Sequence, residues 1–224
     1  MRLLHSSGYE LSRRGFVVAS AGGLAVAAGG PTWAADAGRM TFHSREPNNI
    51  EPPLDELIAD WITPNDLFYV RSHGPTPKID PSQYRLVVEG LVDKRLSLTL
   101  DDLTKMADAD VVASMTCAGN RRAEMARIRE IKGVPWSEGA VGNARWSGLR
   151  LSTLLKAAGV ADGARHMWFE GLDAVASGDS TIPFGGSIPV EKALQDTVDM
   201  PGAIIATKMN GQPLSPDHGF PARA

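Results

Sequence analysis

The 224-residue chain is slightly acidic, with 23 Lys and Arg against 26 Asp and Glu and a formal net charge of −3. Because a surface of this charge cannot neutralise a row of phosphates, the composition argues against nucleic acid as a partner. The 43% hydrophobic and 22% charged residues are ordinary for soluble globular proteins. Cys117 is the single cysteine, so counting excludes an intramolecular disulfide, a four-cysteine metal site and a CxxCH haem attachment.

Residues 1–37 have the layout of a secretory signal. Basic residues, among them the pair Arg13 and Arg14, precede the uncharged stretch 15–30, and small-x-Ala cleavage sites follow it. This stretch is shorter than the ~18 apolar residues of a membrane span, which argues against a stable membrane anchor. The arginine pair with Phe16 resembles a twin-arginine export signal, and an ordinary signal with two adjacent arginines is the alternative. We therefore expect a periplasmic protein.

The rest of the chain divides into a polar, proline-bearing N-terminal arm at 38–66 and a folded domain at 67–224. Strand patterns in the domain are short and follow no regular βαβ rhythm: 84–89, 96–98, 111–115, 166–170 and 203–209. The sequence therefore predicts an α+β fold with mixed sheets and short helices.

The predicted helices and turns have local signals of their own. A short apolar helix is expected within 54–61 of the arm. Thr99 is suited to cap a helix followed by two aspartates, and Ser152 to cap one that ends at Gly159. The pair Asn210-Gly211 is a strong hairpin signal.

The segment 115–122 combines a thiol, a glycine turn and two guanidinium groups at the end of a predicted strand. Arginine favours the thiolate form of a nearby cysteine, which is the form that binds soft metals. A buried structural cysteine beside surface arginines is the alternative. The motif Thr116-Cys117-Ala118-Gly119-Asn120-Arg121-Arg122 resembles the cysteine motif of the sulfite oxidase family of molybdopterin enzymes, whose cysteine ligates molybdenum. Further segments match in the same order: 68–73, 144–148, 169–173, 187–189, 209–214 and 217–223.

The resemblance spans about residues 60–224 and implies a molybdenum–molybdopterin cofactor. It implies that Cys117 is the metal thiolate and that Arg71, near the metal, stabilises charge on an oxyanion. It assigns the pterin and its phosphate to a larger set: Tyr69, Val70, Arg71, Ser72, His73, Asp173, His218 and Arg223. Arginine suits phosphate because its grip is bidentate and permanently charged. Ser72 departs from the family pattern, in which Asn is frequent.

Each of these residues also has an ordinary interpretation. The histidines could be hydrogen-bonding residues, Asp173 a turn residue, and Arg71 or Arg223 half of an ion pair. Trp136 and Trp146 are interpreted as core or rim aromatics. Taken together, the polar residues are better explained by one cofactor.

The implied reaction is the oxidation of sulfite, or a related sulfur oxyanion, to sulfate, with electrons passed to a separate acceptor such as a periplasmic cytochrome c. A methionine sulfoxide reductase-type molybdoenzyme is a second interpretation, although that branch lacks the Ala-Gly-Asn-Arg-Arg continuation after its cysteine. The chain stops at Ala224, where relatives continue into more of the domain and then an immunoglobulin-like dimerisation domain. We therefore expect a C-terminally truncated product with an incomplete site and a doubtful homodimer, and a non-catalytic pterin-binding remnant is the third interpretation.

Overall fold

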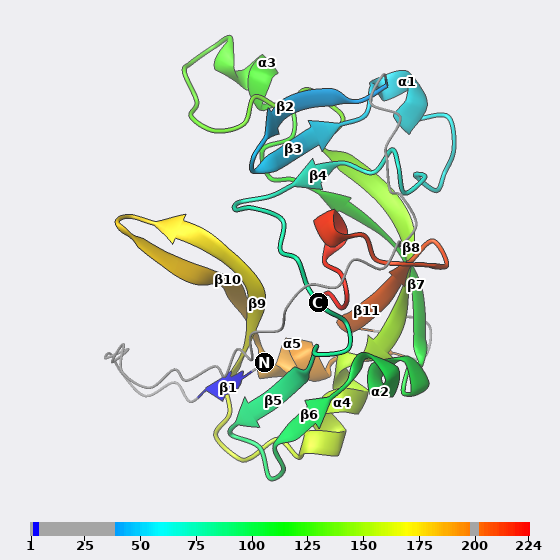
Figure 1. Cartoon of the computed structure of the whole chain (residues 1–224), viewed down its shortest axis with the longest axis vertical. Helices are drawn as coiled ribbons and strands as arrows, with labels where there is room; N and C mark the ends of the chain where they lie inside the picture. The colour runs from blue at the N-terminus through cyan, green and yellow to red at the C-terminus, as the bar shows by residue number, and fades with distance from the viewer. Residues whose placement is uncertain (1, 5–38, 198–201) are drawn as a thin grey trace.

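The computed structural model describes residues 2–4, 39–197 and 202–224. Within these ranges three sheets and several short helices surround a shared interior, which confirms the α+β class (Figure 1). The predicted signal segment lies outside the described residues except for Arg2–Leu4, which form strand β1. No helix in the described part of the chain is long and apolar enough to cross a membrane.

The first sheet has the strand order β10-β9-β1-β5-β6. Its strands are β1 (Arg2–Leu4), β5 (Leu86–Gly90), β6 (Leu96–Leu98), β9 (His166–Ser177) and β10 (Ser180–Pro189). The strand β1 runs parallel to β5 and antiparallel to β9. The long β9–β10 hairpin projects away from the rest of the molecule (Figure 1).

The second sheet has the order β12-β11-β8-β7 and the third the order β2-β3-β4. The second sheet contains β7 (Ala109–Thr116), β8 (Val141–Arg150), β11 (Ile204–Met209) and β12 (Gln212–Pro213). The third contains β2 (Thr41–Arg45), β3 (Asn48–Glu51) and β4 (Val70–Arg71). The third sheet therefore pairs two strands of the predicted N-terminal arm with β4, which begins the predicted site segment.

The helices are α1 (Leu54–Leu57), α2 (Leu100–Lys105), α3 (Arg122–Ala126), α4 (Leu151–Ala158), α5 (Val190–Leu194) and the 3₁₀ turn η1 (Pro216–His218). Thr99 begins α2 with a complete capping box, in which the side chain of Asp102 bonds back to the Thr99 backbone. Gly159 ends α4 with a positive φ of 68°, as predicted.

Two predictions for helices need correction. The helix expected within 54–61 is only α1 at Leu54–Leu57. Ser152 lies inside α4 rather than at its N-cap, because the chain passes directly from β8 through Arg150 into the helix. The Ser152 hydroxyl instead donates to a carboxylate oxygen of Asp196 at 3.0 Å.

Two main cores hold these layers together. The first lies beneath α2 and α4 and includes the fully buried Leu103, Leu149, Leu154, Leu155 and Met167. The second lies against the β7–β8–β11 sheet and contains Phe68, Tyr69, Trp136, Trp146 and Met209, with Cys117 packed on it. The predicted metal ligand thus lies at the margin of a rigid apolar cluster.

Candidate active site around Cys117

Cys117 lies immediately after β7, at the strand end where the sequence predicts it. The strand pairs with β8 along its whole length, up to Thr116 opposite Val141. Beyond the pairing, the Cys117 backbone N–H donates to the oxygen of Ala140 at 2.9 Å. The Gly119 N–H points to the Cys117 sulfur at 3.4 Å, and the thiol is half-buried. A backbone donor aimed at the sulfur stabilises the negative charge of a thiolate.

The guanidinium group of Arg122 lies directly over the cysteine loop. A Cβ atom built on Gly119 would stand 2.3 Å from the Arg122 Nη2, so any larger residue at 119 would displace this guanidinium. The Arg122 Nη1 donates to the oxygen of Val134 at 2.7 Å, which fixes the group in place. Arg122 is not among the predicted site residues, although its place in the cysteine motif is the signal that could have selected it.

Tyr69 and His218 come together with Cys117, although they are distant in sequence. The His218 imidazole is buried and donates from Nε2 to the Tyr69 main-chain oxygen at 3.2 Å. Burial raises the pKa of the Tyr69 phenol; nearby Arg223 opposes this shift and Cys117 adds to it. The Tyr69 phenol thus lies in the electrostatic field of both Cys117 and Arg223.

Arg223 is a half-buried cation on the same side of the site. Its Nη1 donates to the His218 main-chain oxygen at 3.3 Å, and its guanidinium lies 5.6 Å from the ring centre of Trp146. Among the described residues no carboxylate forms an ion pair with it. Burial accordingly lowers the pKa of Arg223. A half-buried cation without an ion-pair partner favours the binding of an external anion.

Arg71, His73 and Asp173 form a second group of polar side chains. The Arg71 Nη2 lies 3.2 Å from the Nδ1 atom of His73. Burial and the Arg71 charge lower the pKa of His73, while Asp173 on β9 raises it. The His73 ring also stacks on Phe184 of β10, with centroids 5.2 Å apart. The segment 69–73 therefore joins this group to the one at Cys117.

Val70 and Ser72 have more limited parts. The Val70 side chain is buried in a separate cluster with Met40, Ile50 and Leu67, and its backbone is paired with Ile50 in the β3–β4 ladder. The Ser72 N–H donates to the oxygen of Asn48 at 3.1 Å.

Trp136 contains an unusual buried donor. Its side chain is fully buried, and its Nε1 is the one buried side-chain nitrogen or oxygen in the described residues without a hydrogen-bond partner. A buried N–H without an acceptor costs free energy unless something supplies an acceptor. The ring packs edge-on against Tyr69. The unpaired Trp136 donor lies in the same apolar cluster as Tyr69, and Arg223 is a cation without an ion-pair partner in the described residues.

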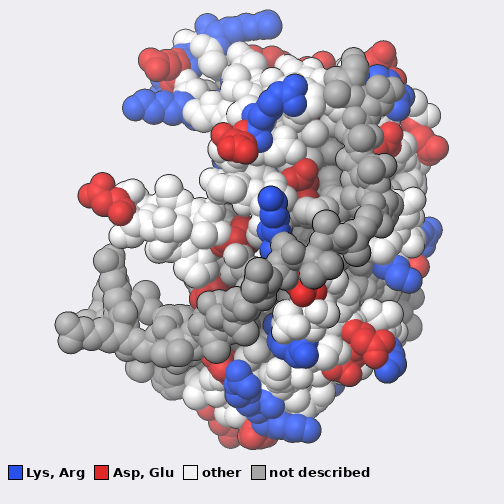
Figure 2. Space-filling model, viewed as in Figure 1, with Lys and Arg blue, Asp and Glu red and all other residues white. Residues whose placement is uncertain are grey.

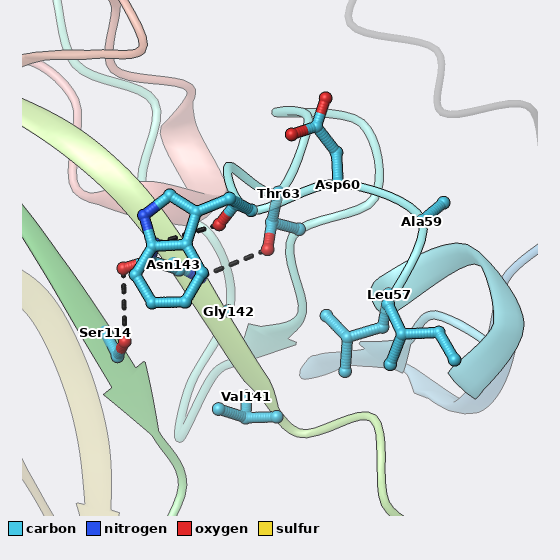
Figure 3. A pocket seen from close by; sticks show the side chains of 10 residues that line it. Leu57, Ala59, Asp60, Thr63, Ser114, Val141, Gly142 and Asn143 are labelled. Carbon is cyan, nitrogen blue, oxygen red and sulfur yellow. Dashed lines mark hydrogen bonds between the residues drawn. The ribbon is translucent and has the colours of Figure 1, made fainter.

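The surface is hollowed between the β9–β10 hairpin and the part formed by the β2–β4 sheet and α3 (Figure 2). A separate shallow pocket lies on another part of the molecule, beside β7 and β8 (Figure 3). There Asn143 accepts from the Ser114 hydroxyl at 3.1 Å and donates to the Trp61 oxygen at 2.9 Å. That pocket contains none of the predicted site residues. No group of three or more possible His, Cys, Asp or Glu ligands gathers within the described ranges.

The fold, the thiol at a strand end and the convergent cations are features of a cofactor-binding oxidoreductase domain. The protein family described as the oxidoreductase molybdopterin binding domain matches residues 73–224. The chain therefore belongs to this molybdopterin-binding family, as its resemblance to sulfite oxidases predicts.

Similar proteins include mitochondrial sulfite oxidases. The protein of Mus musculus is 43% identical over 187 residues, which cover 82% of this chain and 33% of that protein. The protein of Drosophila melanogaster is 46% identical and covers 80% of this chain and 30% of its own length. The chain thus spans about a third of the length of these relatives.

A solved structure has a similar fold. The sulfane dehydrogenase SoxCD of Paracoccus pantotrophus matches with a TM-score of 0.67 and 29% identity, covering 92% of this chain and 51% of that one. The α+β architecture described above is therefore an established fold for molybdopterin-family proteins.

Proposed function

We propose that this domain binds a molybdenum–molybdopterin cofactor and that the protein oxidises sulfite, or a related sulfur oxyanion, to sulfate. The observation that carries the proposal is the convergence of Cys117, Tyr69 and the pair His218 and Arg223 from three separated segments. The similarity to sulfite oxidases supports the substrate class.

The side chains present fit such a cofactor. Cys117 would supply a thiolate to the metal, with the Gly119 N–H stabilising its charge. Arg223 would pair with the phosphate of the pterin, because the described structure offers that cation no carboxylate. Asp173 and His73 would match donor and acceptor groups along the pterin ring. The Trp136 N–H would gain the acceptor that it lacks.

The bound cofactor supplies a centre that transfers an oxygen atom and accepts two electrons. The overall conversion takes sulfite and water to sulfate, two protons and two electrons. Arg71 and Arg122 would attract the oxyanion toward Cys117 and hold its negative charge while the sulfur is oxidised. The apolar ring cluster beneath them, Phe68, Tyr69 and Trp136, excludes water from one side of the site.

The electrons must leave to a separate acceptor, and we propose a periplasmic cytochrome c. The sequence supports this location through the Arg13-Arg14 pair and the uncharged stretch that follows it. Twin-arginine export would fit the proposal because that route carries proteins already folded around their cofactors.

The decisive experiment is the molybdenum and pterin content of the protein purified from molybdate-replete cells. Cys117→Ser should lose molybdenum while keeping the thermal unfolding temperature of the cofactor-free protein. Thr116→Ser, one position earlier on the exposed side of β7, is the matched control and should keep the metal. Absence of molybdenum from the unmodified protein, together with no effect of Cys117→Ser, would contradict the proposal.

A turnover assay then separates the substrates. Sulfite-dependent reduction of cytochrome c supports the proposed reaction, whereas activity only with protein-bound sulfane sulfur would move the substrate toward that of the structural neighbour. Reduction of methionine sulfoxide by the loaded protein would favour the second interpretation. Stoichiometric cofactor without any turnover would favour a pterin-binding remnant.

A further inference from the structure

Strand β3 lies outside the residues that match the family, 73–224, yet it reaches both halves of the site. Its side chains of Asn49 and Glu51 are polar but almost completely buried, with exposed fractions of 1% and 2%. Buried polar groups persist where hydrogen bonds compensate for lost hydration. The partners of these two residues therefore show what the strand holds in place.

Asn49 holds Arg71. The Asn49 Oδ1 accepts from the Arg71 Nη1 and from the Ser72 backbone N–H, both at 3.2 Å. The Asn49 Nδ2 donates to the Ser44 hydroxyl and to the Pro47 oxygen, both at 2.9 Å, and is thereby tied to the β2–β3 turn. Because both ends of the amide are engaged, its acceptor has one orientation toward Arg71. No described carboxylate pairs with Arg71, and the other oxygen that its Nη1 reaches is the Ser72 main-chain oxygen.

Glu51 holds the segment that supports Cys117. Its carboxylate accepts from the backbone N–H groups of Ser137 at 2.8 Å and Gly139 at 2.9 Å. The next residue, Ala140, accepts the backbone hydrogen bond of Cys117. Glu51 is thus connected to the proposed metal ligand by two hydrogen bonds: it holds the Gly139 N–H, and the neighbouring Ala140 oxygen holds the Cys117 N–H.

His43 completes this support. Its Nε2 lies 2.7 Å from the Glu51 Oε1, and its ring packs edge-on against Trp136 with centroids 4.9 Å apart. The chain after β3 also passes close to position 139, which explains the glycine there: a Cβ atom would stand 2.2 Å from the Pro52 main-chain oxygen. One carboxylate therefore fixes the Ser137–Gly139 backbone and, through His43, contacts the buried tryptophan.

We propose that Asn49 and Glu51 are positioning residues: strand β3 fixes Arg71 through Asn49 and the Cys117 loop through Glu51. The strand thereby sets the placement of the anion-binding cation and of the metal thiolate relative to each other. This inference deepens the proposed function and rests on it for the roles of Arg71 and Cys117. Its test needs no cofactor, so the two can fail separately.

The Glu51 half is tested by alkylation of Cys117 with iodoacetamide in the cofactor-free full chain. The single cysteine makes the reaction free of background. Glu51→Ala should speed alkylation about tenfold, since losing the acceptor of the Ser137 and Gly139 backbone amides favours local opening. Glu51→Gln retains one acceptor oxygen and should fall between the two rates. Because Glu51→Gln is the milder change, it keeps the test informative if the alanine variant does not fold.

Leu103→Val is the control for general destabilisation. Leu103 is fully buried in the first core, on α2, away from β3. Alkylation of each variant is measured at the same interval below its own unfolding temperature. An increase specific to the Glu51 variants supports the proposal, whereas equal rates in Glu51→Gln and Leu103→Val would reduce Glu51 to a residue of general stability.

The Asn49 half is tested by phenylglyoxal labelling of Arg71, followed by peptide mass spectrometry. Asn49→Ala should raise the labelling of Arg71 severalfold, because the guanidinium loses its buried side-chain acceptor and keeps only the Ser72 main-chain oxygen and the His73 ring as partners. Asn49→Asp keeps an acceptor oxygen at the same place and should restore protection. Ser44→Ala removes a partner of Asn49 only on the turn side and should leave Arg71 protected. Equal labelling in Asn49→Ala and Ser44→Ala would overturn this half.

Discussion

The imidazole of His218 donates from Nε2 to the main-chain oxygen of Tyr69 at 3.2 Å, across 149 positions of sequence. Its Nδ1 lies 2.7 Å from the Ser215 hydroxyl. Burial lowers the pKa of His218, which favours the neutral imidazole, and in that form Nδ1 accepts from the Ser215 hydroxyl while Nε2 donates. This pair of bonds ties the C-terminal turn η1 to the segment that begins at Tyr69.

The neutral state of His218 predicts a dependence of stability on pH. Burial lowers the pKa of His218 below its ordinary value of 6.5, so the unfolded chain takes up this proton at a higher pH than the folded chain does. The folded state is therefore favoured above pH ~6.5 and loses stability as the pH falls toward the lowered pKa. Thermal unfolding between pH 7.5 and pH 5.5 measures this effect.

The matched variant is His218→Gln, which cannot take up the proton. It should be less stable at pH 7.5 but should lose less stability on acidification than the unmodified protein. Identical pH slopes for the two proteins would show that His218 does not contribute to the acid response.

Replacing Arg223 with Gln should separate cofactor retention from stability. The guanidinium is half-buried without a carboxylate partner in the described residues, so its removal should leave the cofactor-free protein equally stable or more stable. The same change should sharply reduce the pterin content, because the proposed phosphate contact is lost. Pterin fluorescence after denaturation and thermal unfolding of the cofactor-free protein are the two measurements. Unchanged pterin content would contradict the assigned contact.

Replacing two different glycines with alanine should change the free energy of unfolding by very different amounts. A Cβ at Gly148 in β8 would stand 2.0 Å from the backbone oxygen of Ile205 in β11, so Gly148→Ala should cost about 1–3 kcal/mol of unfolding free energy. A Cβ at Gly186 in β10 meets nothing within 4 Å, and Gly186→Ala should change stability by no more than about 0.5 kcal/mol. Urea unfolding of both variants checks this contrast, and equal effects would contradict the close β8–β11 packing.

Leucine truncation should locate the main core. Leu155→Ala in α4 removes a fully buried side chain and should cost about 2–5 kcal/mol. Leu172 is 58% exposed on the β9–β10 hairpin, and Leu172→Ala should change the unfolding free energy by about 0.5 kcal/mol or less. A large loss of stability on truncating Leu172 would show that the hairpin is covered in solution.

The proposed export by the twin-arginine route can be tested by replacing the arginine pair. Replacing both Arg13 and Arg14 with lysine keeps the charge but removes the paired guanidinium groups, so the protein should accumulate in the cytoplasm. Fractionation of cells followed by immunoblotting measures the distribution. Unchanged periplasmic export of the Lys-Lys variant would favour an ordinary signal.

Local sequence signals predicted the elements whose partners lie close along the chain. The Thr99 cap, the Gly159 stop and the β7 pattern are all found, because each depends on a few neighbouring residues. The assignment of Ser152 is wrong because its cap signal is overridden by the direct passage from β8 into α4. The strand predicted at 166–170 extends to Ser177, since pairing with β10 stabilises residues whose own pattern is weak.

For the site, the ordered motifs selected Cys117, Arg71, His218 and Arg223 without any coordinates. The structure adds that Tyr69, His218 and Arg223 are joined through the His218 imidazole and main chain, and that Arg71 lies beside His73. It also adds Asn49 and Glu51, which no motif indicates. Their partners are up to 88 positions away in sequence.

The sequence by itself determined the chemistry of this protein: the single thiol, the cations around it and the family to which they belong. Only the tertiary structure decided which polar groups lack a hydrogen-bond partner and which are fixed by hydrogen bonds. A short motif fixes the identity of a side chain, but burial and hydrogen bonding depend on strands that meet from distant parts of the chain. The unpaired donor of Trp136 and the fixed guanidinium of Arg71 are therefore properties of the fold.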